Sequence, residues 1–310
     1  MKPTHYHFIL NPASRGGRGA RAFFGIEDRY LKGSIPYTLH VPSSVEETLT
    51  LSRELADAHT VIIAAGGDGT VNTVATGLVQ SGSPAVMGIL PLGTGNALSY
   101  TCGVRKIEKA VETLFSGSIY AMDLIKTNNK TISYVTFMAG VGFDGKVLAI
   151  RNQISLGGFL SFPIAMLVTM LKDIGNPKST ISVAINGRNV LRAEKISSAV
   201  ISNGHCYGFG FPAVPRAYLD DGQIELQLFP TKRSQFSAMA QYGLGWKYYP
   251  PSVERFSAES IEIQGERAGQ FDGEVINQKV YSLELKPQSL RILAADGRFF
   301  SKPPLDQIRL

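Results

Sequence analysis

The sequence predicts two domains, a Rossmann-like α/β domain followed by a β-sandwich-like domain. The chain has 310 residues, which is more than one hydrophobic core usually serves. In the first 120 residues or so, short apolar runs alternate with helical patterns, whereas a period of two dominates afterwards. We therefore place the domains at residues 1–122 and 123–288, and expect residues 289–310 to return to the first domain.

In the first domain, continuous apolar runs predict strands that are buried on both faces, at residues 7–10, 61–65 and 85–90. Helical spacing predicts helices between and after them, at residues 45–58, 70–80 and 106–117. Ser43 and Ser44 precede the first of these helices as caps, and Gly117 closes the last. Strands that alternate with helices imply right-handed crossovers and a parallel sheet.

In the second domain, apolar and polar residues alternate with a period of two, at residues 120–128, 131–141, 179–187, 193–203, 222–229, 260–265 and 281–287. Turn-forming pairs such as Asn186-Gly187 and Asp221-Gly222 separate these segments. We therefore expect antiparallel sheets, interrupted by helical segments at residues 154–171 and 232–248.

The net charge and the cysteine content limit the kinds of binding partner and structural site that we expect. A net charge of +6 suits anionic small molecules or an anionic membrane surface, and no basic and aromatic stripe suggests nucleic acid. Cys102 and Cys206 lie far apart, which argues against a disulfide framework or a zinc site. No hydrophobic region of signal-peptide length follows Met1, so we expect a cytoplasmic protein.

Residues 154–171 carry no charge, and eighteen such residues are at the lower limit for crossing a bilayer. Glycine, serine and proline dilute the segment, however. This composition favours a buried or interfacial helix over a transmembrane span.

The loop GGDGT, residues 66–70, follows the second buried strand. Glycines let the backbone approach a ligand closely, and exposed N–H groups at a helix start can bind an anion. We expect Thr70 to cap the following helix. Asp68 would repel a phosphate unless a magnesium ion lies between them. A plain turn with a capping threonine is the alternative.

Two further loops support a ligand site. NPASRGG, residues 11–17, follows the first strand, and PLGTGNALS, residues 91–99, follows the third. In a doubly wound sheet the three loops would meet at the carboxyl edge, where ligands bind. The sequence contains neither the GK[ST] of a Walker loop nor a GxGxxG dinucleotide turn at these positions.

Two acidic turns complete the candidate residues. In FDGE, residues 271–274, Asp272 and Glu274 would face the same side of a strand, so one could act as a base while the other binds a metal. In DDG, residues 220–222, a metal site and an ordinary turn are nearly equal alternatives. Asp-Gly is also the commonest hairpin signal, so FDGE taken alone would indicate a hairpin turn.

Taken together, NPASRGG, GGDGTVN, PLGTGNALS, MDL, AGVGFD, YLDDGQIEL and FDGE resemble the diacylglycerol-kinase catalytic-domain family in order and spacing. This family includes soluble bacterial lipid kinases and sphingosine-kinase relatives. The resemblance extends from Asn11 to about Leu293. It implies a first domain like that of phosphofructokinases and NAD kinases, ATP and Mg²⁺ as cofactors, and a lipid as phosphate acceptor.

The resemblance also implies residue roles. Nucleotide binding would involve Asn11, Pro12, Ser14, Arg15, Gly66, Gly67, Asp68, Gly69, Thr70, Asn72, Gly93, Thr94, Gly95 and Asn96. Asp272 would be the catalytic base, and Glu274 its partner carboxylate at the nucleotide and metal. A structural magnesium ion would bind Asp221 and the backbone carbonyls of Tyr218 and Gln223, while Asp68 would lie near the magnesium at the phosphates.

The sequence departs from the family at several positions. Ala97 stands where many bacterial relatives have Asp, Thr73 where Glu is usual, and only Ser43 or Ser44 is near an expected threonine. Two alternatives therefore stay open. One is an NAD kinase-like enzyme, which the loops at 11–17 and 91–99 fit poorly. The other is a lipid-binding protein that has lost catalysis, against which the retained Asp272 and Glu274 weigh.

The expected partners follow from the same interpretation. The apolar residues 154–171 and the Gly- and Phe-rich residues 206–215 are candidate walls of a lipid site. We expect a lipid substrate and peripheral association with the inner, anionic face of the membrane. The sequence leaves a homodimer open.

Overall fold

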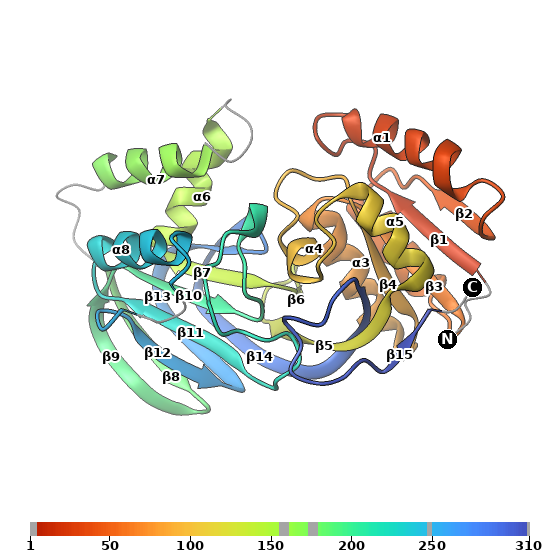
Figure 1. Ribbon diagram of the computed structural model, residues 1–310. Coiled ribbons are helices and arrows are strands. Elements are labelled where there is room, and N and C mark those ends of the chain that lie inside the picture. The colour runs from red at the N-terminus through yellow and green to blue at the C-terminus, as the bar shows by residue number, and fades with distance from the viewer. Residues whose placement is uncertain (1–4, 155–160, 173–178, 247–249, 309–310) are drawn as a thin grey trace.

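The computed structural model describes residues 5–154, 161–172, 179–246 and 250–308 (Figure 1). These residues form two units that lie side by side, an α/β unit and a β-rich unit, which we call the N-terminal and C-terminal units. The predicted fold class is confirmed. Residues 155–160 of the apolar segment and residues 247–248 of the second helical segment lie outside the described residues.

The N-terminal unit is built on four parallel strands in the order β2-β1-β3-β4. Their bounds are β1 (His5–Leu10), β2 (Tyr37–His40), β3 (Thr60–Gly66) and β4 (Val86–Pro91). Every residue of β3 and β4 is buried. The apolar runs that predicted strands at 61–65 and 85–90 therefore fill the centre of the sheet, as both-face burial requires.

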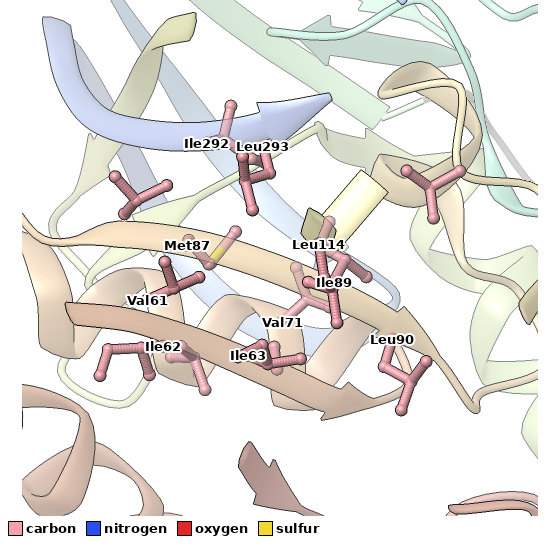
Figure 2. Close-up of a cluster of buried hydrophobic side chains, with 14 of the residues drawn as sticks. Val61, Ile62, Ile63, Val71, Met87, Ile89, Leu90, Leu114, Ile292 and Leu293 are labelled. Carbon is pink, nitrogen blue, oxygen red and sulfur yellow. The ribbon is translucent and has the colours of Figure 1, made fainter. Parts of the chain in front are cut away.

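Helices cover this sheet: α1 (Arg18–Ile26), α2 (Val45–Glu54), α3 (Asp68–Ser81), α4 (Ala97–Thr101) and α5 (Ile107–Ser116), with a π-helical turn at Glu27–Leu31. Figure 2 shows how α3 and α5 pack on the sheet: Val71 and Leu114 contact a cluster that includes Ile63, Ile89 and Leu293. Residues from five elements thus share one core.

The capping signals are confirmed at α2 and wrong at α3. The Ser44 hydroxyl accepts a hydrogen bond from the Glu47 amide, and the Glu47 carboxylate accepts one from the Ser43 amide at 2.7 Å. In contrast, α3 begins at Asp68 with Gly67 as its N-cap and no side-chain cap. Thr70 lies inside the first turn of α3, so it is not the cap that we expected.

The C-terminal unit is an antiparallel array in the order β12-β11-β10-β7-β13-β14, to which the β8-β9 hairpin adds beside β13. The bounds are β6 (Tyr134–Val135), β7 (Met138–Gly142), β8 (Ser179–Ile185), β9 (Arg188–Ile196), β10 (Ser198–Ser202), β11 (Ile224–Phe229), β12 (Glu254–Ala258) and β13 (Ser260–Phe271). Its helices are α6 (Phe143–Gln153), α7 (Ser161–Lys172) and α8 (Lys232–Gly243), with a short 3₁₀ turn at Gly208–Gly210. None of the described helices has the length and apolar character that crossing a bilayer requires.

One strand, β14 (Glu274–Ala294), runs through both units. It pairs with β13 in the C-terminal unit and with β5 (Ser118–Thr127) between the units. Its end lies parallel to β4, where Arg291 pairs with Val86. Residues 281–287, which the sequence predicts as a strand, and residues 289–294, from the segment expected to return to the first domain, are therefore parts of one strand with a register shift between Lys286 and Leu290. A two-residue strand, β15 (Asp306–Gln307), adds to β5.

Candidate functional site

The three glycine-rich loops meet at the carboxyl edge of the parallel sheet, as predicted. Asn11, at the end of β1, donates a hydrogen bond through Nδ2 to the Thr70 hydroxyl of α3 at 3.1 Å. Arg15 donates through Nε to the carbonyl oxygen of Gly93, after β4, at 2.8 Å. Each contact joins two different loops, so the three loops form one surface.

Close backbone contact between two loops requires glycine at Gly67 and Gly93. A Cβ atom on Gly93 would lie 2.2 Å from the Gly67 Cα, which no real contact allows. Gly93 is buried in this contact, whereas Gly67 is half-buried and Gly69 is exposed at the N-terminus of α3. Unpaired N–H groups and the helix dipole favour an anion at such a place.

Asn96 fixes the shape of the third loop. Its side chain accepts a hydrogen bond from the Gly93 amide at 3.1 Å and donates one to the Gly93 carbonyl at 2.9 Å. Asn96 itself has a φ of 51°, in the left-handed region that asparagine tolerates. Its side chain thus holds the loop, whereas Thr94 at the tip is exposed.

The first loop contains a polar atom that lacks a partner. Ser14 is buried, and among the described residues its hydroxyl makes no hydrogen bond. A buried hydroxyl of this kind calls for an explanation such as a ligand oxygen or a water molecule. Pro12 and Arg15, on either side of it, are exposed.

Asp68 lies half-buried between the second and third loops. One of its carboxylate oxygens accepts a hydrogen bond from the Ala97 amide at 2.7 Å. Burial, and to a lesser extent the charge of Asp272, raise the pKa of Asp68 to about 6. Because the contact involves the backbone of residue 97, the alanine at this position still supplies it.

Asp272 stands in a two-residue turn between β13 and β14. Asp272 and Gly273 have φ values of 48° and 86°, as a type I′ hairpin turn requires. Asp272 therefore lies in a hairpin turn and also belongs to the candidate site, because the turn points its carboxylate toward the N-terminal unit. Asp272 is only 3% exposed.

The Asp272 carboxylate accepts five hydrogen bonds. Oδ2 accepts from the Thr136 amide at 2.6 Å, the Thr136 hydroxyl at 2.7 Å and Asn72 Nδ2 of α3 at 2.7 Å. Oδ1 accepts from the amides of Phe137 and Met138 at 3.1 and 3.0 Å. Burial still raises the pKa of Asp272, although these donors lower it. The carboxylate joins α3 to the start of the C-terminal unit.

Glu274 lies exposed two residues further on. Its Oε1 atom would be 3.7 Å from a Cβ on Gly69, in the first turn of α3. Asp272 and Glu274 thus both reach α3. The turn, and not the alternation along a strand that we expected, gives them this shared direction.

A second acidic group lies around Asp221, away from the loops. Burial first, and the charges of Glu225, Asp123 and Asp220 after it, raise the pKa of Asp221 to about 6. Asp221 accepts a hydrogen bond from the Gln223 amide at 3.0 Å, and Tyr218 is exposed. In the part of the chain that the structure describes, no group of three or more His, Cys, Asp or Glu residues has the geometry of a metal site.

Oxygen ligands such as the Asp221 carboxylate and the carbonyls of Tyr218 and Gln223 are of the type that Mg²⁺ prefers. A cation would also offset the charge that burial disfavours there. This site stays a prediction.

Some residues of the site give little signal in the sequence. Thr136 contributes two of the five donors to Asp272, yet it is only one of several polar residues in the alternating segment at 131–141. Ser43 and Ser44, considered as replacements for a threonine at the nucleotide, are engaged at the start of α2 instead.

The chain matches two family models. Residues 5–127 match the diacylglycerol kinase catalytic domain, and residues 138–294 match the YegS C-terminal NAD kinase beta sandwich-like domain. A "Probable lipid kinase YegS-like" of Klebsiella pneumoniae (strain 342) is 30% identical over 80% of this chain and 80% of its own. A "Probable lipid kinase YegS" of Salmonella arizonae is 28% identical over 74% and 76%.

A solved structure shows the same fold. A diacylglycerol kinase from Bacillus anthracis str. Sterne superposes with a TM-score of 0.69 over 95% of this chain and 98% of its own. Its sequence identity is 18%, so this likeness concerns the fold alone.

Proposed function

Since this chain belongs to the family of YegS-like lipid kinases with a diacylglycerol kinase catalytic domain, we propose that it transfers the γ-phosphate of ATP to a lipid hydroxyl group in a Mg²⁺-dependent reaction. The observation that carries this proposal is the meeting of three glycine-rich loops opposite Asp272 and Glu274. Phosphoryl transfer depends on positioning and charge neutralisation, which such an arrangement can provide.

ATP would bind along the three loops. The exposed Gly69 and half-buried Gly67 at the N-terminus of α3, and the Ser14 hydroxyl, which has no hydrogen-bond partner among the described residues, support a phosphate position there. Arg15 lies next to it, although its Nε atom already binds the third loop. Asn11, Thr70 and Asn96 would hold the loops in place.

Asp68 and Glu274 are the carboxylates that would face a metal at the phosphates. Asp68 is the first residue of α3, and Glu274 approaches Gly69 in the same turn. When bound, Mg²⁺ supplies positive charge that neutralises the phosphate oxygens.

Asp272 would act as the general base that accepts the proton of the lipid hydroxyl as its oxygen bonds to phosphorus and ADP departs. The donors around Asp272 fix its carboxylate and favour its charged form. The same five hydrogen bonds occupy most of its lone pairs. Asp68, with a pKa of about 6 and the Ala97 amide as its closest donor, is therefore the second candidate for the base.

The acceptor would reach the site from the C-terminal unit. The helix α7 exposes Ile164, Leu167 and Leu171, and Leu244 and Trp246 are exposed after α8. Figure 1 shows α6, α7 and α8 on the same side of the C-terminal strands. An exposed apolar surface next to a phosphate site suits a lipid, whether diacylglycerol or a sphingoid-type acceptor, at a membrane surface.

The test is incubation of the purified protein with labelled ATP, Mg²⁺ and a total lipid extract, followed by chromatography of the lipids. We expect a labelled phospholipid, with NAD as a control acceptor that is not labelled. Labelling of water-soluble acceptors alone would contradict the proposal.

Substitution separates the two candidate bases. Asp272→Asn should lower phosphate transfer by about 10²–10⁴-fold while ATP binding persists. The asparagine amide of this variant cannot accept all five hydrogen bonds, so thermal unfolding must be measured alongside. If a folded Asp272→Asn variant retains transfer, Asp272 is not the base.

A further inference from the structure

Another carboxylate, the half-buried Asp144, lies outside the residues assigned so far. It is the second residue of α6, and burial raises its pKa. Its Oδ1 accepts a hydrogen bond from the Tyr207 hydroxyl at 2.7 Å, and its Oδ2 accepts one from Gln270 Nε2 at 3.0 Å. Within the described ranges Asp144 forms no ion pair. Its two neutral donors, Tyr207 and Gln270, connect Asp144 to two different parts of the candidate site.

The first side is the turn that carries Asp272. A carboxylate only accepts hydrogen bonds, so Asp144 forces the Gln270 amide to present its nitrogen to Asp144. The Gln270 oxygen then faces the turn, where it accepts a hydrogen bond from the Gly273 amide at 3.0 Å. Gln270 is 4% exposed, so water does not replace these contacts. Asp144 thereby sets the orientation of the group that holds the turn.

The second side is the third nucleotide loop. Tyr207 precedes Gly208–Gly210, and the Phe209 amide donates a hydrogen bond to the Gly95 carbonyl at 2.7 Å. Phe209 adopts a φ of 61°, which is strained for a residue with a side chain. Contacts with neighbouring residues must therefore keep this segment in its conformation. The hydrogen bond from the Tyr207 hydroxyl to Asp144 is one of these contacts.

We propose that Asp144 is a positioning residue, which through Gln270 and Tyr207 fixes both the turn that carries Asp272 and the segment that contacts the nucleotide loop at Gly95. Its kinetic effects rest on the proposed function. The contacts themselves do not, and they can be tested on the free protein.

The two arms predict different kinetic signatures. Gln270→Met removes both hydrogen bonds of the first arm, so kcat should fall by about tenfold with little change in the KM for ATP. Tyr207→Phe removes only the second arm, so the KM for ATP should rise by about three- to tenfold with little change in kcat. Asp144→Ala should combine both effects.

A matched pair of controls is available in the same unit. Tyr242 donates a hydrogen bond to Gln227 Oε1 at 3.1 Å, and both residues are buried. Tyr242→Phe removes this one contact, whereas Gln227→Met also removes the donation of Gln227 Nε2 to the Ala213 carbonyl at 3.0 Å, so each control loses as many buried hydrogen bonds as the variant that it matches. None of these contacts involves Asp272 or the nucleotide loops. Both should leave kcat and the KM for ATP close to those of the unaltered protein.

Hydrogen exchange gives a readout that is independent of turnover. In nucleotide-free protein, Gln270→Met should speed exchange at residues 271–274 but not at 208–211, and Tyr207→Phe should do the reverse. Asp144→Ala should speed both. Equal effects from the control pair, or no selective change in exchange, would overturn the inference. If the unaltered protein transfers phosphate to no lipid but the exchange pattern appears, the proposed function fails and the positioning role stands.

Discussion

Asp68 and Asp272 lie close enough for the charge of one to raise the pKa of the other, yet their surroundings differ. Asp272 is enclosed by five donors, whereas the Ala97 amide is the closest donor to Asp68. Pairs of carboxylates in unlike environments are typical of sites that divide acid, base and metal-binding roles. The structure thus offers two groups with separable tasks.

The pKa of Asp68 predicts a pH-dependent stability. Since the folded pKa is about 6 and the ordinary value is 3.8, the folded protein holds this proton more tightly than the unfolded chain. The resulting stabilisation is present below pH 3.8 and is lost as the pH rises through 6. Asp68→Asn should therefore raise the unfolding temperature most above about pH 6.5 and least near pH 4, measured without nucleotide or Mg²⁺. A constant difference between the two proteins across this range would contradict the assignment.

Thr136 predicts a stability effect of its own. Thr136→Val keeps the backbone donor and the side-chain shape but removes the hydroxyl donor to Asp272. The loss of a hydrogen bond to a charged group should lower the free energy of unfolding by about 1.5–3 kcal/mol in urea denaturation. Thr169→Val is a control, because that buried hydroxyl donates to the neutral carbonyl of Ala165 and should cost only about 0.5–1.5 kcal/mol. Equal losses would show that the Asp272 charge adds nothing.

At the scale of elements, strands and helices with strong periodic or capping signals were predictable from the sequence. The buried strands β3 and β4 and the capped helix α2 lie where the apolar runs and serines indicate. The full length of strand β14 was not predictable from the sequence, because Pro287 and Gln288 suggest that the strand is interrupted there. In the structure Gln288 takes a φ of 48° and the pairing with β5 resumes after the shift.

The candidate site likewise has one part that was predictable from the sequence and one part that was not. The convergence of the glycine loops follows from local motifs and the parallel sheet, so the sequence predicts it. The amides around Asp272 do not follow from any motif, because Thr136–Met138 and Asp272 are 134 to 136 residues apart. Contacts of this separation depend on how the chain packs, which periodicity does not reveal.

The exposed leucines of α7 test the proposed association with anionic membranes. Ala165 and Thr169 are buried, whereas Leu167 and Leu171 are 58% and 59% exposed. Replacing both leucines with serine should weaken binding to anionic vesicles by about tenfold or more in a sedimentation assay, because less apolar surface enters the interface. Thermal stability should not change. Val190→Ser, at an exposed position of the β8-β9 hairpin, is the matched control. Unaltered vesicle binding by the serine variant would exclude α7 as the contact.

At the scale of the whole molecule, β14 makes the two units parts of one sheet. It pairs with β13, with β5 and, at its end, with β4. Asp272 lies two residues before the first residue of β14, and Ile292 and Leu293 near its end belong to the core of the N-terminal unit. The position of the acidic turn is thus coupled along one strand to the unit with the glycine loops.

This continuity predicts cooperative unfolding. Far-UV circular dichroism and the fluorescence of Trp246, the single tryptophan, should give coincident urea transitions, because neither unit keeps its sheet when β14 is lost. A ligand such as ATP with Mg²⁺ should shift both transitions together. Two separate midpoints would show that the units unfold independently despite the shared strand.

A strand common to both halves also limits how substrates are exchanged. Because β14 is hydrogen-bonded to strands of both units, a wide motion of one unit away from the other would have to break these pairs. In the proposed reaction, ADP would instead leave through small displacements of surface segments. The main segment of this kind is the strained turn at Phe209, whose amide donates a hydrogen bond to the Gly95 carbonyl. The rate of the catalytic cycle would then be limited by the movement of this short turn, while the strands of the shared sheet keep their positions.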